Sequence, residues 1–387
     1  MGKLSDICDL INEKIKMNQE INKRLCGTYI STENMLPNKQ GITPASSIPT
    51  SGSFTAYKES DTLVSNIRPY FKKIWYAENS GGCSNDVLVF RAKNGTNPYF
   101  VYYTLSNDEF FNYSMKTSKG TKMPRGDKKA IMNYPVHRLD LNTQNRATKI
   151  VRVVDEKIRL NNMINNNLEE QAMAIFKMWF LSFEQFNGQM PKAWVPGVLG
   201  DFVEIKRGAS PRPIQKYLSD TGVHWLKISD ATGISSPFLN EIKEFIIEDG
   251  LKKTVFLKSG SLVLSNSATP GIPKILDIDT CIHDGWLYFP SSNFSNEYLY
   301  LFFKYIRKNL VAFGNGSVFT NLKTDILKNY PTYLPPEDTL KQFDQLVQPI
   351  FSMILSITRE TKRLCEIRDT LLPKLMNGEI DVSTIDI

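Results

Sequence analysis

Two long stretches of the chain carry apolar residues three and four positions apart, which is the spacing of one face of an α-helix. The first covers residues 147–179 and contains no proline, whereas the second covers residues 340–375 and contains Pro349. At 1.5 Å per residue, the pattern predicts two helices of about 40 residues, each about 55–60 Å long. A proline inside the second stretch should kink that helix or delay its start.

Both apolar faces turn polar near the middle, at Asn161 and Asn165 in the first stretch and at Thr361 in the second. A polar residue in a helix–helix seam costs stability but fixes register and orientation. The alternative is a weak helix centre, because further asparagines surround these positions. Two amphipathic helices of matching length in one chain are expected to pack on each other in antiparallel fashion.

The segments between the helices show a mixed α/β pattern. Short β-branched or aromatic runs bounded by Gly, Pro, Asn or Ser predict strands. These runs are residues 86–90, 99–105, 255–257, 261–264 and 286–289. Residues 296–311 have helical apolar spacing, and the Gly/Ser/Pro clusters at 41–53 and 208–213 predict loops.

The chain also repeats itself. Residues 120–135 (GTKMPRGDKKAIMNYP) match residues 316–331 (GSVFTNLKTDILKNYP) at an offset of 196, and residues 2–7 resemble 197–202. Residues 63–66 resemble 262–266, and Cys83 with Asp86 matches Cys281 with Asp284. Such order predicts two units of about 195 residues, each a globular block followed by a helix.

We therefore predict an α+β fold with two globular α/β domains, two long antiparallel coiled-coil helices and a pseudo-twofold internal duplication. The expected domains are residues 1–142, a central helix at 143–190, a second globular domain at 191–334, and a C-terminal helix with its tail at 335–387.

Composition excludes several classes of protein. The chain has 387 residues, 41% hydrophobic and 22% charged, which favours globular cores over disorder. We expect a cytoplasmic protein, because no stretch approaches the roughly 18 apolar residues of a membrane span and the N-terminus has no apolar run. The 5 cysteines form no Cys-x-x-Cys pair and only 3 histidines occur, so no metal site is expected.

The net charge of +7 is uneven. Residues 1–142 carry 19 Lys and Arg against 13 Asp and Glu, and residues 116–129 hold six basic side chains against Asp127 alone. A local field of that sign favours a phosphate backbone. A solvated charged loop explains the same run equally well.

Three stretches carry a resemblance to a known family. They are residues 175–184 (IFKMWFLSFE) followed by 187–202, residues 371–380 (LLPKLMNGEI), and residues 29–35 (YISTENM) with 65–70 (SNIRPY) downstream. Together with the duplication, they make the whole chain resemble the specificity subunit of type I restriction–modification systems. The resemblance implies that the two globular domains are target-recognition domains, each reading one half of a bipartite site in double-stranded DNA.

The same resemblance implies that the paired helices set the unspecified spacer and dock modification (methyltransferase) subunits, two per chain, with restriction subunits as further partners. S-adenosylmethionine, ATP and Mg²⁺ would then belong to partner chains, with no cofactor in this one. We infer different half-sites and an asymmetric target, since the two matching loops differ sharply in sequence.

Candidate DNA contacts lie in polar, Gly/Pro-punctuated loops that follow strand-like runs at related places in both repeats. Side chains that bond base edges would read sequence, whereas Lys and Arg on phosphates would position the domain. A solvent-exposed loop residue is the alternative for each one. The candidates are Ser65, Asn66, Arg68, Tyr70, Lys119, Lys122 and Arg125 in the first block, and Lys227, Ser229, Asn266, Ser267, Thr269, Asn315, Ser317, Asn321 and Lys323 in the second.

Catalytic motifs are missing from the sequence. Asn97-Pro98-Tyr99 lacks the second proline of an adenine methyltransferase motif, and Gly314-Asn315-Gly316 is not followed by the Gly-Lys-Ser/Thr of a Walker loop. No nucleophile motif such as Gly-x-Ser-x-Gly occurs either. We expect a non-catalytic binding subunit, and keep two alternatives: a coiled-coil adaptor for proteins, and a bifunctional DNA enzyme with an unrecognised active site.

Overall fold

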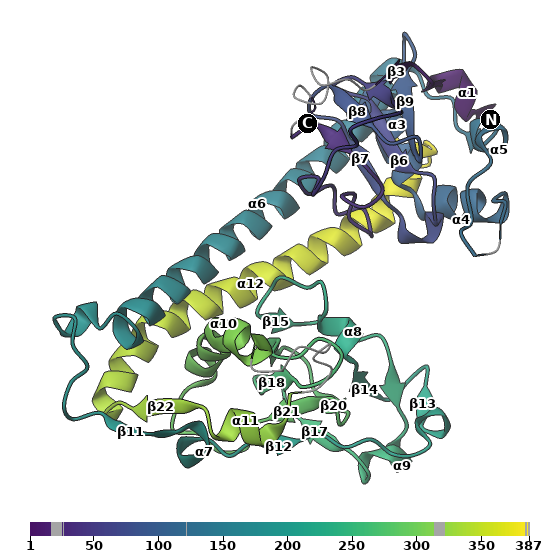
Figure 1. Cartoon of the computed structure of the whole chain (residues 1–387). Helices are drawn as coiled ribbons and strands as arrows, with labels where there is room; N and C mark the ends of the chain where they lie inside the picture. The colour runs from purple at the N-terminus through teal and green to yellow at the C-terminus, as the bar shows by residue number, and fades with distance from the viewer. Residues whose placement is uncertain (17–24, 26, 121, 313–321, 384, 386–387) are drawn as a thin grey trace. The chain divides into compact units, whose positions relative to one another are not determined.

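The computed structural model describes residues 1–16, 25, 27–120, 122–312, 322–383 and 385. The chain divides into two compact units, shown with the whole chain in Figure 1. Unit 1 comprises residues 1–157 and 364–387, and unit 2 comprises residues 158–363. Each unit holds one globular domain, called head 1 and head 2 below, and a part of each long helix.

The two long helices are α6 (Leu141–Phe180) and α12 (Glu337–Met376), each of 40 residues, as the periodicity predicts. Asp140 caps the start of α6, because its carboxylate accepts the Thr143 N–H at 3.0 Å. Pro349 lies well inside α12, so the expectation that it delays the start of this helix is wrong. A proline removes one backbone hydrogen bond, and the apolar face of the helix outweighs that loss.

Within unit 2, the predicted polar positions of the two helices meet. The Asn161 side-chain amide donates to Glu360 Oε2 at 2.8 Å and to Thr361 Oγ1 at 3.3 Å. The Asn165 amide donates to Thr358 Oγ1 at 3.2 Å. Because rising numbers on α6 meet falling numbers on α12, the pairing is antiparallel. Buried apolar contacts, such as Phe176 with Phe343, flank this polar layer.

Within unit 1, the other ends of the same helices also pair. Asp155 of α6 forms an ion pair with Arg368 of α12 at 3.2 Å. Ala147 and Val151 share a buried cluster with Leu372 and Leu375. The prediction of an antiparallel helix pair is therefore confirmed in each unit.

The described residues of head 1 form two four-stranded sheets and three helices of five or more residues. One sheet has the order β2 (Cys8–Ile11), β9 (Val87–Ala92), β6 (Thr62–Ser65), β7 (Ile74–Tyr76), and the other β3 (Lys14–Lys16), β5 (Ser53–Tyr57), β8 (Gly81–Cys83), β4 (Tyr29–Ile30). The helices are α3 (Pro98–Ser106), α4 (Asp108–Lys116) and α5 (Lys128–Met132), with the short α1 (Leu4–Ile7) at the start.

The part of head 2 that the structure describes contains two five-stranded sheets. The first has the order β12 (Lys206–Arg207), β21 (Trp286–Tyr288), β18 (Leu262–Ser265), β19 (Pro273–Leu276), β15 (Phe238–Leu239). The second has the order β13 (Leu218–Ser219), β16 (Phe245–Ile246), β14 (Val223–Leu226), β20 (Thr280–Ile282), β17 (Val255–Leu257). Its helices are α7 (Leu199–Phe202), α8 (Ile228–Ala231), α9 (Glu248–Leu251), α10 (Asn296–Ala312) and α11 (Thr324–Lys328).

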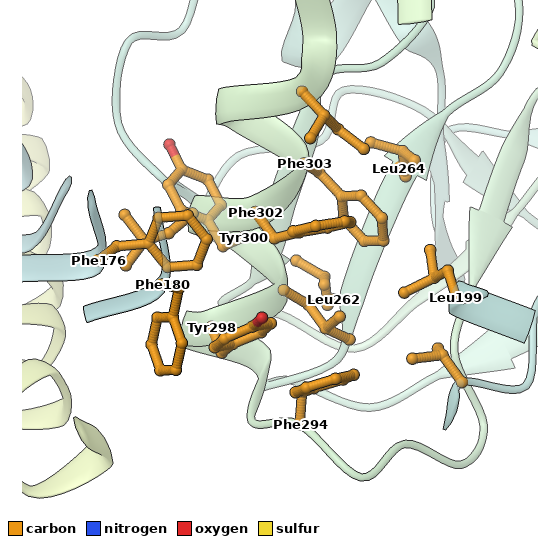
Figure 2. Packing of buried hydrophobic residues seen from close by; sticks show 14 of the residues in the cluster. Phe176, Phe180, Leu199, Leu262, Leu264, Phe294, Tyr298, Tyr300, Phe302 and Phe303 are labelled. Atoms are coloured by element: carbon orange, nitrogen blue, oxygen red, sulfur yellow. The ribbon is translucent and has the colours of Figure 1, made fainter. Parts of the chain in front are cut away.

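The core of unit 2 joins α6 to head 2. Figure 2 shows Phe176 and Phe180 of α6 beside Tyr298 of α10, all of them buried. Trp179 belongs to the same cluster and is 4% exposed. Aromatic side chains bury large apolar areas, so this cluster fixes head 2 on its helix.

The duplication appears in matching hydrogen bonds. The Leu4 N–H donates to the Tyr134 carbonyl at 2.8 Å, and the Leu199 N–H donates to the Tyr330 carbonyl at 2.9 Å. In parallel, β1 (Gly2–Lys3) pairs with β10 (Pro135–Val136) as β11 (Val195–Val198) pairs with β22 (Pro331–Leu334). The matches of residues 2–7 with 197–202 and of Tyr134 with Tyr330 are thus real structural equivalences.

Two local predictions are wrong. Residues 99–105 form α3 rather than a strand, because Asn97 caps the helix by accepting the Tyr99 N–H and Pro98 occupies its first position. The match of Cys83 with Cys281 is out of register by one residue. Gly81 lies opposite Tyr57, and Thr280 lies opposite Leu257, so Cys281 corresponds to Gly82.

Candidate nucleic-acid interface

Two loops of head 1 run side by side. The segment that leaves β6 forms a bridge from Ile67 to Arg125, and the Arg68 N–H donates to the Pro124 carbonyl at 2.9 Å. The Lys119 N–H donates to the Arg125 carbonyl at 2.9 Å, which closes the second loop on itself. The structure therefore brings together predicted residues from two distant segments.

Tight local packing explains why the loops take this course. A Cβ on Gly126 would lie 2.9 Å from Asn66 Oδ1 and 2.7 Å from Ile131 Cδ1, so a larger residue would have to displace these buried side chains. Arg68 and Lys72 take the left-handed backbone conformation, with φ of 50° and 51°, on either side of the short turn at Pro69–Phe71. This turn displays the Tyr70 ring, which is 48% exposed.

Cations and acids alternate on this surface. Arg125 Nη2 lies 3.2 Å from Asp86 Oδ1, and Lys119 Nζ lies 2.7 Å from Asp127 Oδ2. The Lys119 hydrogen bond, with two backbone N–H groups at the start of α5, lowers the pKa of Asp127 to about 2, so this carboxylate stays ionised. Lys122 is exposed as well. The surface can offer exposed cations to an anionic partner.

The head 1 candidates thus fall into two groups. Tyr70, Lys119, Lys122 and Arg125 are exposed, and Arg68 is half-buried. Ser65 and Asn66 are buried, so their side chains shape the loop and do not form part of the exposed surface. The Ser65 hydroxyl donates to the Ile67 carbonyl at 3.1 Å.

Head 2 repeats the same backbone arrangement, which we call the loop frame. In head 1, the Asn66 N–H donates to the Asp86 carbonyl at 2.8 Å and the Asn66 carbonyl accepts the Gly126 N–H at 3.2 Å. In head 2, the Asn266 N–H donates to the Gly285 carbonyl at 2.8 Å and its carbonyl accepts the Leu322 N–H at 2.6 Å. The two heads therefore hold three chain segments together in the same way.

Around this frame, the head 2 candidates differ in exposure. Asn266 is buried, Ser267 and Thr269 are half-buried, and Ser229 and Lys323 are exposed. Lys227 forms an ion pair with Glu244. Lys227 also lies close to the frame, because the preceding residue Leu226 lies opposite Ile282 in the sheet. Burial lowers the pKa of His283, the charge of Lys227 lowers it further, and Asp284 opposes this shift. The predictions at Asn315, Ser317 and Asn321 lie outside the described residues.

Sequence reasoning missed three residues of head 2 that converge on Asp284. Arg212 Nη2 lies 3.5 Å from Asp284 Oδ2, the Ser210 hydroxyl donates to Oδ1 at 2.8 Å, and the Arg207 Nε–H donates to the Asp284 carbonyl. Although burial opposes the shift, the Ser210 hydrogen bond and the charge of Arg207 hold the pKa of Asp284 below its usual value. The only signal in the sequence is that the Gly/Ser/Pro loop at 208–213 directly follows Arg207 and contains Arg212.

Thiols and metal ligands add no chemistry to the described part of the chain. Burial raises the pKa of Cys8 and Cys83 to about 12 and that of Cys281 to about 11, so these thiols are poor nucleophiles. Among the described residues, no group of three His, Cys, Asp or Glu side chains is placed to hold a metal ion. Within the same residues, no helix has the length and apolar character that crossing a membrane requires.

Comparison with known proteins matches both repeats to one family. The family model described as "Type I restriction modification DNA specificity domain" matches residues 1–170 and again 191–364. The chain is 24% identical over 411 residues to the type I restriction enzyme HindI specificity subunit of Haemophilus influenzae, covering 84% of this chain and 87% of that protein. It is 23% identical over 311 residues to the MjaIX specificity subunit of Methanocaldococcus jannaschii, covering 76% and 71%.

A solved structure has the same fold. The S subunit of a type I restriction–modification system from M. genitalium superposes with a TM-score of 0.58 at 13% identity, covering 97% of this chain and 95% of that one. At that identity the likeness concerns the fold alone.

Proposed function

Because this chain belongs to the family of type I restriction modification DNA specificity domains, we propose that it reads a bipartite, asymmetric DNA site for a type I restriction–modification complex. Each head takes one half-site. The observation that carries this proposal is the loop frame, which recurs in both heads but carries different exposed side chains. Head 1 offers Tyr70, Lys122 and Arg125 there, whereas head 2 offers Arg212 and Lys323.

Physical chemistry supports this division of labour. Lys and Arg on phosphates position a domain on a duplex, and side chains that reach base edges read its sequence. A shared backbone with different exposed side chains suits two domains that read different sequences. The positive net charge favours DNA over most protein surfaces.

We assign the spacer to the paired helices. Each has 40 residues, or about 60 Å at 1.5 Å per residue. In unit 2, the buried Asn161 bonds across the helix pair and so favours one register over its neighbours. A fixed register suits a device that sets the number of unspecified base pairs between the half-sites.

The helix pair of unit 2 also exposes apolar side chains, which suits the docking of modification subunits, two per chain. On α6, Leu160 and Ile164 are 41% and 43% exposed, and on α12 Leu346 and Met353 are 47% and 53% exposed. Exposed apolar side chains gathered along a helix are typical of a surface that a partner covers. The specificity subunit itself is non-catalytic. The methyl donor, ATP and Mg²⁺ bind the modification and restriction subunits of a cytoplasmic complex.

The test is an exchange of head 1 in the assembled methyltransferase. Replacing residues 1–142 by the corresponding domain of another specificity subunit should change one half of the methylated motif and leave the other half intact. Methylation that persists at the original motif would refute the assignment of one half-site to each head. If the complex binds no DNA at low salt, the chain acts as a protein adaptor, and methyl transfer by the purified chain alone would instead reveal an active site of its own.

A further inference from the structure

The same short turn carries an acidic side chain in each head. In head 1 this turn joins β8 to β9 and contains Asp86, and in head 2 it joins β20 to β21 and contains Asp284. The register shows how the turns correspond, since Ser65 lies opposite Val87 and Ser265 lies opposite Trp286. The two acids therefore occupy neighbouring positions of one structural turn, which belongs to the loop frame.

Each of these acids holds an exposed arginine. Arg125 Nη2 lies 3.2 Å from Asp86 Oδ1, with the Arg125 side chain 57% exposed. Arg212 Nη2 lies 3.5 Å from Asp284 Oδ2, with the Arg212 side chain 82% exposed. The arginines come from different segments, because Arg125 follows α4 whereas Arg212 follows β12. The same pairing is thus built twice, by different routes.

Stability does not explain these pairs. Ion pairs this exposed contribute little to folding, because water screens them and two long side chains lose freedom. A carboxylate beside a DNA backbone also repels phosphates, so an acid on a basic surface weakens general binding. The acid therefore acts by restricting the conformations of the arginine. Arginine is flexible, and an anchored guanidinium loses less freedom when it meets a rigid target.

We propose that Asp86 and Asp284 are positioning residues that orient Arg125 and Arg212 to read a guanine edge in the half-site of each head. This inference rests on the proposed function. The ion pair engages Nη2 alone in each arginine. A guanidinium has five N–H donors in a planar fork, so donors remain for the O6 and N7 acceptors of guanine, the commonest specific contact of arginine in the major groove.

The test replaces the acid and measures discrimination. Asp86→Asn keeps the size of the side chain and the backbone carbonyl that accepts the Asn66 N–H, and it removes only the charge. In complex with the modification subunits, the variant should bind the mapped cognate duplex on the order of tenfold more weakly. Its binding to an unrelated duplex should be unchanged or stronger, because a repulsive charge is gone. The lost discrimination should fall on one G·C pair in the half-site of head 1.

Matched variants separate this role from general effects. Asp9→Asn removes the same charge from another exposed pair of head 1, Asp9 with Lys93 at 3.4 Å, and should leave discrimination intact. Asp284→Asn should shift the loss to the other half-site. In an Arg125→Ala background, Asp86→Asn should change discrimination no further, because the acid acts through the arginine.

Three results would decide against the proposal. Equal tightening on cognate and unrelated duplexes by Asp86→Asn would mean that the acid only repels the backbone. A loss of discrimination that persists in the Arg125→Ala background would mean that it acts through another group. If the wild-type complex shows no preference for the mapped duplex, the proposed function itself fails and the inference falls with it.

Discussion

Two asparagines in the seam of the helix pair should respond to the same substitution with opposite changes in stability. Asn165 is 9% exposed, and its Oδ1 has no hydrogen-bond partner among the described residues, while its amide donates to Thr358 at 3.2 Å. Asn161 is 1% exposed, and its amide donates both to the Glu360 carboxylate and to Thr361. Asn165→Leu therefore removes an unpaired buried oxygen, whereas Asn161→Leu breaks a charge-assisted hydrogen bond.

The magnitude follows from these contacts. Removing the unpaired Asn165 oxygen from the interior recovers about 1–3 kcal/mol, and the lost hydrogen bond to Thr358 costs about 1 kcal/mol. The Thr358 hydroxyl keeps a contact, because Ser236 Oγ lies 3.1 Å away. Added apolar burial contributes about 1 kcal/mol more. We expect Asn165→Leu to stabilise unit 2 by about 1–3 kcal/mol and Asn161→Leu to destabilise it by about 1 kcal/mol.

Urea unfolding of the full chain, followed by circular dichroism, measures both changes. The two variants share the same substitution in the same helix seam, so differences in helix propensity and side-chain volume cancel between them. The prediction concerns the sign of the difference. A loss of stability in Asn165→Leu as large as that in Asn161→Leu would refute the view that, of these two asparagines, Asn161 alone has its buried polar group paired.

Three further results are expected. Replacing Lys119 and Lys122 together by alanine should flatten the dependence of log K on log salt by about 1.8, since each lost phosphate contact removes about 0.9, and an unchanged slope in fluorescence anisotropy would exclude phosphate contacts there. Inserting seven residues after Asn165 adds about 10 Å of helix and should lengthen the unspecified spacer by about three base pairs, whereas an unchanged spacer rejects the ruler. Burial lowers the pKa of Lys274 in the folded chain to about 8, whereas the unfolded chain keeps this proton to higher pH. The free energy of unfolding of wild type should therefore rise relative to that of Lys274→Met between pH 8 and 10, and a constant difference would refute this.

Periodic features of the sequence predicted most of the fold. The helices α6 and α12 carry a repeated apolar face over 40 residues, long enough for the signal to exceed local exceptions such as Pro349. The duplication was visible because equivalent turns use similar residues, as at Tyr134 and Tyr330. The polar positions of the seam could also be predicted, because a break in an apolar face is itself a pattern.

Features that depend on a few residues were harder to predict. Aromatic and β-branched composition suggested a strand at 99–105, but the cap at Asn97 favours the helix that this segment forms. A one-residue difference in loop length shifted the match of Cys83 with Cys281. Arg212 was missed because its pairing with Asp284 joins segments about 70 residues apart, and a lone exposed arginine leaves no periodic trace.

A genome-wide map of modified bases in the host, with this chain present and deleted, tests the central claim most directly. The account predicts that deletion removes methylation from one asymmetric motif made of two short sequences and an unspecified spacer, and that restoring the chain restores it. Unchanged methylation, or the loss of a continuous motif without a spacer, would contradict the assignment of two heads to two half-sites.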